Sequence, residues 1–256
     1  IAMTAIGAGA QARVEDQIRS LGSNLIIVLP GNVTSGGVRM GSGAQLTLSE
    51  DDAAALPREI PEIEVAAPQL RGGGQVVFGN SNWSTQVLGV TPDYLVAREW
   101  AVESGREFTA AEVDAAAKVV LVGQTVARTL FGESDPVGET IRINRQNYEV
   151  IGVLESKGTN GPQNQDDVIM LPLHTAQLKL GGAGTTTVRT INLQVRSADE
   201  MDLAQAQATA IMRARHGLAA GADDDFLVRN QADLISSVEE TSGTFTALLG
   251  SIAAIS

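Results

Sequence analysis

The chain has 256 residues, 43% of them hydrophobic and 19% charged, which is typical of a globular protein and excludes a disordered or fibrous one. Its 18 basic and 30 acidic residues give a net charge of −12, which excludes nucleic acids as partners because they bind to basic surfaces. The absence of cysteine excludes disulfides, zinc–thiolate sites and thiol catalysis.

Both ends of the sequence are predicted to be helical and rich in apolar residues. Residues 1–20 carry an apolar stripe through Ala10, Val14 and Ile18, with the charged side chains mostly elsewhere. A second helix is predicted over residues 231–256. The chain starts without Met and stops inside an apolar run, so we expect it to be a piece of a longer protein.

The next part of the sequence predicts a strand, a loop and a capped helix. Residues 25–29 (LIIVL) form a short continuous apolar run before a Pro-Gly pair, which is typical of a buried strand. Residues 31–45 contain five glycines and are expected to form a mobile loop. Ser49 and Asp52 have the spacing of a capping box, which predicts a helix to about residue 56.

The rest of the sequence alternates strand and helix patterns. A second capping box, from Thr109 to Glu112, precedes a short helix. Strands are predicted over residues 65–78, 83–90, 119–122, 139–144, 148–155, 168–171, 190–196 and 226–229. A short helix is predicted over residues 91–97, and further helices over residues 124–131 and 199–215. On the last of these, the apolar stripe is predicted to run through Leu203, Ala210, Ile211 and Ala214.

These elements predict an α+β fold. The strand–helix–strand units over residues 25–78 and 190–229 are expected to combine into one split ferredoxin-like layer. Residues 98–185 are then expected to form an insertion that has a hairpin and helices of its own.

Few sequence motifs point to catalysis or to a bound cofactor. Residues 7–12 (GAGAQA) fit the dinucleotide pattern GxGxxA, but no strand precedes them, which favours small residues packed in a helix. The acidic runs at residues 51–52 and 223–225 lack the alternating oxygen ligands of a calcium loop, so solvated cap or turn carboxylates are expected. His174 and His216 lie outside any metal-ligand spacing, and a surface or capping role is expected for His174. The sequence therefore predicts no catalytic residue, no cofactor and no metal site.

A series of short motifs resembles the extracytoplasmic core domain of MacB-type ABC transporter permeases. The most specific motifs lie in the middle of the chain, in the family's order and spacing. They are residues 105–109 (GREFT), 119–124 (VVLVGQ), 130–132 (LFG), 135–138 (DPVG), 141–143 (IRI) and 148–153 (YEVIGV). Residues 22–31 (GSNLIIVLPG) resemble the family's first strand. The resemblance covers essentially the whole chain, although the loops at 31–45 and 156–188 carry no specific motif.

The resemblance implies a periplasmic domain between the first and second membrane spans of a permease with four spans. It implies stalk helices over residues 1–20 and 231–256, a porter subdomain made of residues 21–92 with 186–230, and a mixed α/β sabre subdomain inserted over residues 93–185. It also implies a homodimer that binds a MacA-like adaptor and, in some members, a TolC-like outer-membrane channel. ATP and Mg would bind to a nucleotide-binding domain outside this sequence. The domain itself would then be a mechanical and docking element of tripartite efflux, not an enzyme.

Two other functions stay open at this point. A lipoprotein-releasing permease of the LolC/LolE kind shares the architecture but passes its cargo to a carrier protein. The other alternative is an unrelated ligand-binding or enzymatic domain between two membrane anchors. Such a domain would be expected to have a large apolar pocket with converging ionisable groups.

The Gly-rich loop contains the first candidate functional residues. Val38 and Met40 are apolar, and a loop so rich in glycine is not expected to bury them. An exporter must pass its cargo across the surface farthest from the membrane. We therefore predict that Val38 and Met40 dock the adaptor.

The stalk helices contain the second set of candidates. The first helix leaves the membrane and the last one returns to it, so within a subunit the two are expected to run antiparallel. Their outer ends then set a register that places Arg19 near Asp233 and Arg13 near Glu239. We predict that these pairs align the two helices, since exposed ion pairs stabilise a fold by only about 0–1 kcal/mol.

Overall fold

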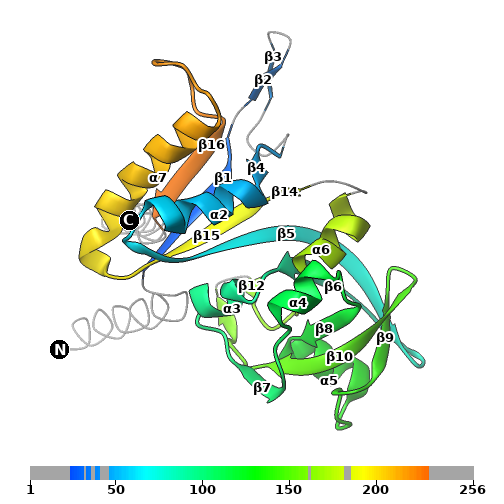
Figure 1. The fold of residues 1–256 in the computed structure, drawn as a ribbon. Coiled ribbons are helices and arrows are strands. Elements are labelled where there is room, and N and C mark those ends of the chain that lie inside the picture. The colour runs from blue at the N-terminus through cyan, green and yellow to red at the C-terminus, as the bar shows by residue number, and fades with distance from the viewer. Residues whose placement is uncertain are drawn as a thin grey trace, which may run out of the picture.

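The fold combines one long twisted sheet with helices packed against it (Figure 1). It is a computed structural model that describes residues 24–31, 33–35, 38–40, 46–160, 163–181 and 186–230. The helices predicted over residues 1–20 and 231–256 lie outside this range. Among the helices that are described, none is both long and apolar enough to cross a membrane.

The main sheet has ten strands, in the order β16-β1-β15-β5-β6-β13-β8-β10-β7, with β9 paired to β10 and β5. Their bounds are β1 Leu25–Pro30, β5 Ile63–Phe78, β6 Ser81–Val90, β7 Val102–Gly105, β8 Val119–Val122, β9 Thr140–Ile143, β10 Gln146–Leu154, β13 Val168–Pro172, β15 Thr190–Val195 and β16 Phe226–Asn230. The small pairs are β2 Val33–Ser35 with β3 Val38–Met40, β4 Leu48–Ser49 with β14 Thr187–Val188, and β11 Thr159–Asn160 with β12 Gln163–Asn164. The helices are α2 Glu50–Glu59, α3 Asp93–Ala97, α4 Ala110–Asp114, α5 Gln124–Phe131, α6 Leu173–Ala176 and α7 Met201–Arg215, with a π-helical turn over Gln177–Gly181 and a 3-10 turn over Ala198–Glu200.

Four strands and two helices form one half of the molecule. The strands β16, β1, β15 and β5 are neighbours in that order, and every pair is antiparallel. The chain runs through them as β1-α2-β5 and β15-α7-β16, with α2 and α7 on one face of the sheet (Figure 1). Ile26 pairs with Leu193 and Val28 with Ile191, and all four side chains are fully buried. The two strand–helix–strand units expected from the sequence therefore do interleave in one layer.

Strand β5 joins this half to the rest of the sheet. Its first part, Ile63 to Gln69, pairs with β15, and its second part, from Gln69 onward, pairs with β6. Beyond β6 the sheet is mixed, because β13 runs parallel to β6 and antiparallel to β8, which is parallel to β10. The residues between β6 and β15 therefore extend the sheet through their own strands.

Both predicted capping boxes are confirmed. At the start of α2, the backbone N–H of Asp52 donates to the Ser49 hydroxyl (3.2 Å), and the Asp52 carboxylate accepts from the Ser49 backbone N–H (3.0 Å). Thr109 and Glu112 make the equivalent pair of bonds at α4. Helix α2 continues to Glu59, three residues beyond the predicted end, since Leu56 and Ile60 are fully buried and hold the last turn in place.

The prediction of a plain loop over residues 31–45 was wrong in part. This segment contains the antiparallel hairpin β2–β3, with Val33 paired to Met40 and Ser35 to Val38. The glycine content alone suggested a loop. However, β-branched residues stand on both sides of a Gly-Gly pair, which is a typical hairpin pattern.

The predicted apolar stripe of α7 needs correction. On β15, Ile191 and Leu193 are buried on one face, and Asn192, between them on the opposite face, is also only 4% exposed. Helix α7 buries a different stripe, and Leu203 is 50% exposed. The stripe runs through Met201, Ala204, Ala208 and Met212. Many alanines make several helical phases almost equally apolar, so packing against the sheet decides which phase faces inward.

Candidate functional site

The base of the β2–β3 hairpin is held by hydrogen bonds to the turn before β16. The hairpin leaves after β1 and returns before β4, and Figure 1 shows it standing away from the rest of the chain. The backbone N–H of Gly31 and the hydroxyl of Thr47 both donate to the carbonyl oxygen of Asp225, each at 2.8 Å. One carbonyl group thus holds both ends of the segment that carries the hairpin.

Gly31 is required at this position by a close backbone approach. A Cβ atom there would lie 2.7 Å from the carbonyl carbon of Asp225 and 2.7 Å from the nitrogen of Phe226. Such contacts are far shorter than van der Waals distances, and backbone atoms cannot rotate away from them. The strand β1 and the turn before β16 are therefore held in direct contact.

The Asp225 side chain belongs to a second layer of bonds, formed by Asp52, Arg215, His216 and Asp225, which we call the base cluster. His216 is nearly buried, with its Nδ1 2.7 Å from Asp225 Oδ1 and its Nε2 3.4 Å from Asp52 Oδ2. The Nε of Arg215 donates to Asp52 Oδ1 at 2.8 Å. The base cluster links the start of α2, the end of α7 and the turn before β16, which are the three elements that surround the hairpin base.

Asp52 is ionised in this setting. Burial acts to raise the pKa of its carboxyl group, but the hydrogen bonds from Ser49 and Arg215 and the charge of His216 outweigh burial and hold the pKa below its usual value. Asp52 therefore has two roles. It caps helix α2, and its negative charge binds Arg215 and His216 in the base cluster. The sequence predicted only the first of these roles.

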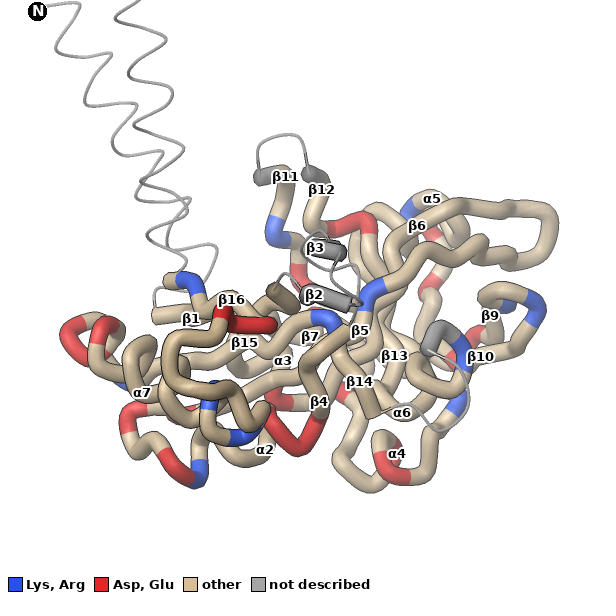
Figure 2. Tube along the Cα trace, turned by 90° about the horizontal axis from the view of Figure 1, so that it is seen from above, with Lys and Arg blue, Asp and Glu red and all other residues tan. Residues whose placement is uncertain are grey.

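A contact between His174 and Glu50 connects α2 to the other half of the molecule. His174 at the start of α6 lies with its Nε2 3.2 Å from Oε1 of Glu50. The pair stands at the edge of a groove of about 540 Å³ between α2 and α4. Figure 2 shows acidic segments at both of these helices. His174, for which a surface or capping role was expected, thus contacts the other half of the molecule.

The predicted docking residues fall on the hairpin itself. Val38 and Met40 are the first and last residues of β3. The predicted stalk pairs, Arg13 with Glu239 and Arg19 with Asp233, lie outside the described residues. Both residues thus lie on the hairpin, beyond the bonded base described above. Their docking role and the stalk pairs stay predictions.

The chemistry of these groups is that of ion pairs and hydrogen bonds. Across the part of the chain that the structure describes, no group of three or more His, Asp or Glu side chains is arranged to hold a metal ion. The acidic runs at residues 51–52 and 223–225 contribute Asp52 and Asp225, which converge on the imidazole of His216.

The mixed α/β fold is that of periplasmic domains of ABC transporters. It matches the crystal structure of the periplasmic region of MacB from Actinobacillus actinomycetemcomitans with a TM-score of 0.71 and 22% identity, over 89% of this chain and 98% of that one. It also matches the extracellular domain of the noncanonic ABC-type transporter YknZ from Gram-positive bacteria, with a TM-score of 0.63 and 19% identity, over 81% of this chain and 100% of that one.

The sequence gives the family. The model of the MacB-like periplasmic core domain matches residues 1–211, and this chain belongs to that family. Two relatives named macrolide export ATP-binding/permease protein MacB are 41% identical, from Bdellovibrio bacteriovorus, and 42% identical, from Chlorobaculum tepidum. They align with 100% and 96% of this chain, which spans only 39% and 38% of their own lengths. The resemblance expected from the sequence is confirmed.

Proposed function

We propose that this chain is the extracytoplasmic domain of an ABC export permease, which transmits motion from the membrane and docks an adaptor at the β2–β3 hairpin. The observation that carries the proposal is the pairing of Ile26 with Asn230. These residues lie near the start of β1 and at the end of β16, so both flanking segments leave from one end of the sheet. The hairpin follows the other end of β1. Membrane attachment and docking would then occupy opposite ends.

The subdomains of the family fit the strand order. We propose that residues 21–92 with 186–230 form a split ferredoxin-like porter subdomain, that residues 93–185 form the sabre subdomain, and that residues 1–20 and 231–256 form the stalks. The antiparallel order β16-β1-β15-β5 supports the porter assignment. Strand β6 pairs with β5 on one side and with β13 on the other, so it would join the porter subdomain to the sabre subdomain.

The proposed role of the chain is mechanical. The relatives are ATP-binding/permease proteins of which this chain spans about two fifths, so ATP hydrolysis would take place in a part of the transporter outside this sequence. The partners we propose are a second copy of the permease, a MacA-like adaptor and a TolC-like channel. Motion would enter through the segments beside Ile26 and Asn230, and the base cluster would keep the hairpin fixed to the moving sheet.

The experiment measures adaptor binding to hairpin variants of this chain. Val38→Asp with Met40→Asp should weaken binding of the MacA-like adaptor without lowering the melting temperature. Leu203→Asp is the matched control, since Leu203 is an exposed apolar residue on α7, away from the hairpin. If the hairpin variant binds the adaptor as well as the parent chain does, the adaptor interface lies on another surface. Binding of a lipoprotein carrier in place of the adaptor would favour a lipoprotein-releasing permease.

A further inference from the structure

A second concave surface lies on the opposite side of the sheet from α2 and α7. Ile27 and Asn192 pair with each other in β1 and β15, between residues that pack under the helices, so by strand alternation they face the other side. They line a cleft of about 730 Å³, together with residues of β5, β6, β13 and α3. This volume lies within the range of about 300–1,000 Å³ that is typical of ligand sites.

The charge of the cleft is opposite to that of the chain. Arg71 and Arg98 line it, and Arg71 also lines an adjoining hollow with Arg189. Among the described residues that line the cleft, the one acid is Asp167. Its carboxylate already accepts hydrogen bonds from Trp83 Nε1 (2.8 Å) and Thr85 Oγ1 (2.7 Å). A chain with 30 acidic and 18 basic residues thus gathers three arginines here.

The groove between α2 and α4 differs from the cleft in its charge. It is lined by four acids and two basic residues, namely Glu50, Glu64, Asp93, Asp114, Arg58 and His174. Figure 2 shows acidic segments around α2 and α4 and basic segments beside β5. These two concave surfaces therefore differ in the sign of their charge, and of the two it is the cleft that suits an anion.

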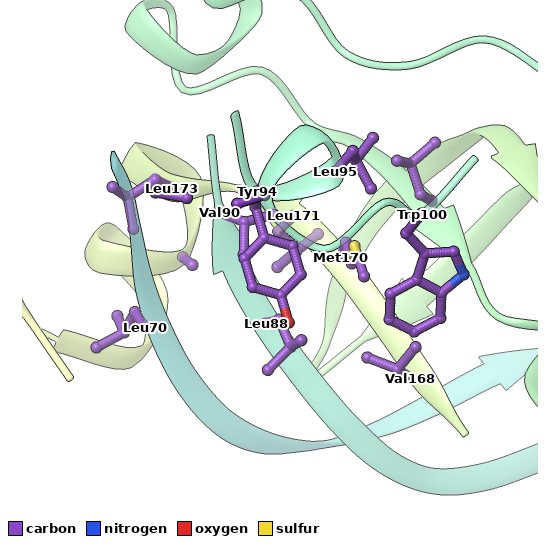
Figure 3. Packing of buried hydrophobic residues seen from close by; sticks show 14 of the residues in the cluster. Leu70, Leu88, Val90, Tyr94, Leu95, Trp100, Val168, Met170, Leu171 and Leu173 are labelled. Atoms are coloured by element: carbon purple, nitrogen blue, oxygen red, sulfur yellow. The ribbon is translucent and has the colours of Figure 1, made fainter. Parts of the chain in front are cut away.

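The rest of the cleft offers hydrogen bonds and apolar contact. The side-chain amide of Gln86 lies against the guanidinium group of Arg71, and with its oxygen turned toward Arg71 it accepts from Arg71 Nε at 2.9 Å. Figure 3 shows the Tyr94 hydroxyl directed toward Leu88, and both residues line the cleft. Burial raises the pKa of Tyr94, while the charges of Arg98 and Arg71 oppose the rise. The cleft thus combines cations with hydrogen-bonding groups and apolar surface.

We propose that this cleft binds a polycarboxylate ligand, with Arg71 and Arg98 as the groups that contact its carboxylates and Arg189 as an outer cation. Guanidinium groups bind carboxylates through paired, charge-assisted hydrogen bonds. The same chemistry belongs to a small polycarboxylic acid and to an acidic peptide. This site is distinct from the hairpin, and the proposal goes beyond adaptor docking.

The two tryptophans of the chain provide the measurement. Trp100 lines the cleft, and Trp83 donates to Asp167 at its edge. Citrate and an end-blocked hexaglutamate peptide, each titrated into the 256-residue chain at low salt, should change the tryptophan fluorescence saturably. Added salt should weaken the effect. Hexalysine should have no saturable effect. A response to citrate alone would identify a small acid, and a response to hexaglutamate alone would identify an acidic peptide.

Variants connect the signal to the arginines. Arg71→Gln with Arg189→Gln removes two exposed cations and should weaken the binding of the responding polycarboxylate about tenfold or more. Arg98→Gln tests the half-buried cation separately, with its melting temperature as a check on folding. Arg58→Gln is the matched control, because it removes an exposed arginine from the opposite groove. The proposal is overturned if neither polycarboxylate gives a saturable signal, or if the double variant binds like Arg58→Gln.

Discussion

The backbone nitrogen of Gly31 lies 2.8 Å from the carbonyl oxygen of Asp225, which fastens the end of β1 to the turn that begins β16. The same carbonyl accepts from Thr47, where the chain returns from the β2–β3 hairpin. A contact between segments that lie far apart in the sequence therefore fixes the position of the hairpin. Its geometry leaves no room for a side chain at residue 31.

Gly31→Ala should lower the free energy of unfolding by about 1–3 kcal/mol, because the new methyl group would press against backbone atoms of Asp225 and Phe226. For a domain of this size, the melting temperature should fall by about 2–4 °C for each kcal/mol. Gly73→Ala is the control, since a Cβ at Gly73 meets nothing within 4 Å. Equal melting temperatures for the two variants would contradict the close approach at Gly31.

The base cluster predicts a pH dependence of stability. The pKa of Asp52 is lower in the folded chain than its ordinary value of 3.8, so folding favours the ionised form. The stability that this provides is present above the ordinary pKa and is lost as the pH falls through the lower, folded pKa. Asp52→Asn should therefore be less stable at neutral pH and should lose less stability than the parent chain on acidification. Denaturant titrations at neutral pH and below about pH 4 measure the difference.

Asp51→Asn is the matched control for this measurement. Asp51 lies in the same turn of α2 but is exposed, and no base-cluster bond involves it. Its substitution keeps every bond of the base cluster, so the variant should retain the pH dependence that Asp52 provides. If Asp52→Asn and Asp51→Asn gave the same slope, the assigned role of Asp52 would be wrong.

Local patterns in the sequence predicted much of the fold. The Ser49–Asp52 spacing predicted the start of α2, and the apolar run at Val119–Val122 predicted β8 with its observed bounds. Both signals come from neighbouring residues. The phase of α7 was mispredicted because its alanines leave the apolar face ambiguous, so that packing against the sheet decides it. Sequence patterns of this kind are overridden by tertiary contacts.

The base cluster could not have been predicted in the same way. Asp52 and Arg215 lie 163 positions apart, and only the order of β16, β1 and β15 brings α2 and α7 together. The one sequence pattern that pointed to a member of the base cluster was the capping box, which placed Asp52 in the first turn of its helix. His216 carried no sequence signal, because its partners come from two different parts of the chain. The pairing of the strands brings acids that are far apart in the sequence into one site.

The isolated chain should be a monomer or a weak dimer. A net charge of −12 opposes self-association at low salt. Sedimentation equilibrium at micromolar concentration should give the monomer mass, with any dimer increasing as salt screens the charge. A tight dimer at low salt would contradict this expectation and would indicate an apolar interface strong enough to overcome the repulsion.

The last prediction concerns the segments that flank the described domain. Because Ile26 pairs with Asn230, the chain positions that precede and follow the sheet start side by side. The sequence predicts two antiparallel stalk helices from there, with Arg19 near Asp233 and Arg13 near Glu239. If these helices carry ATP-driven motion, a bond between them should stop transport without unfolding the domain.

The chain contains no cysteine, so a pair of introduced thiols can be tested without background. Gln17→Cys with Ile235→Cys in the full-length transporter should crosslink efficiently on oxidation, because disulfides form only between closely facing residues. Transport should cease in the crosslinked protein and return on reduction. Two reactive thiols that fail to crosslink would disprove the register of the stalks. Crosslinking with undiminished transport would leave the register intact and show that the motion passes between subunits, not between the two stalks of one subunit.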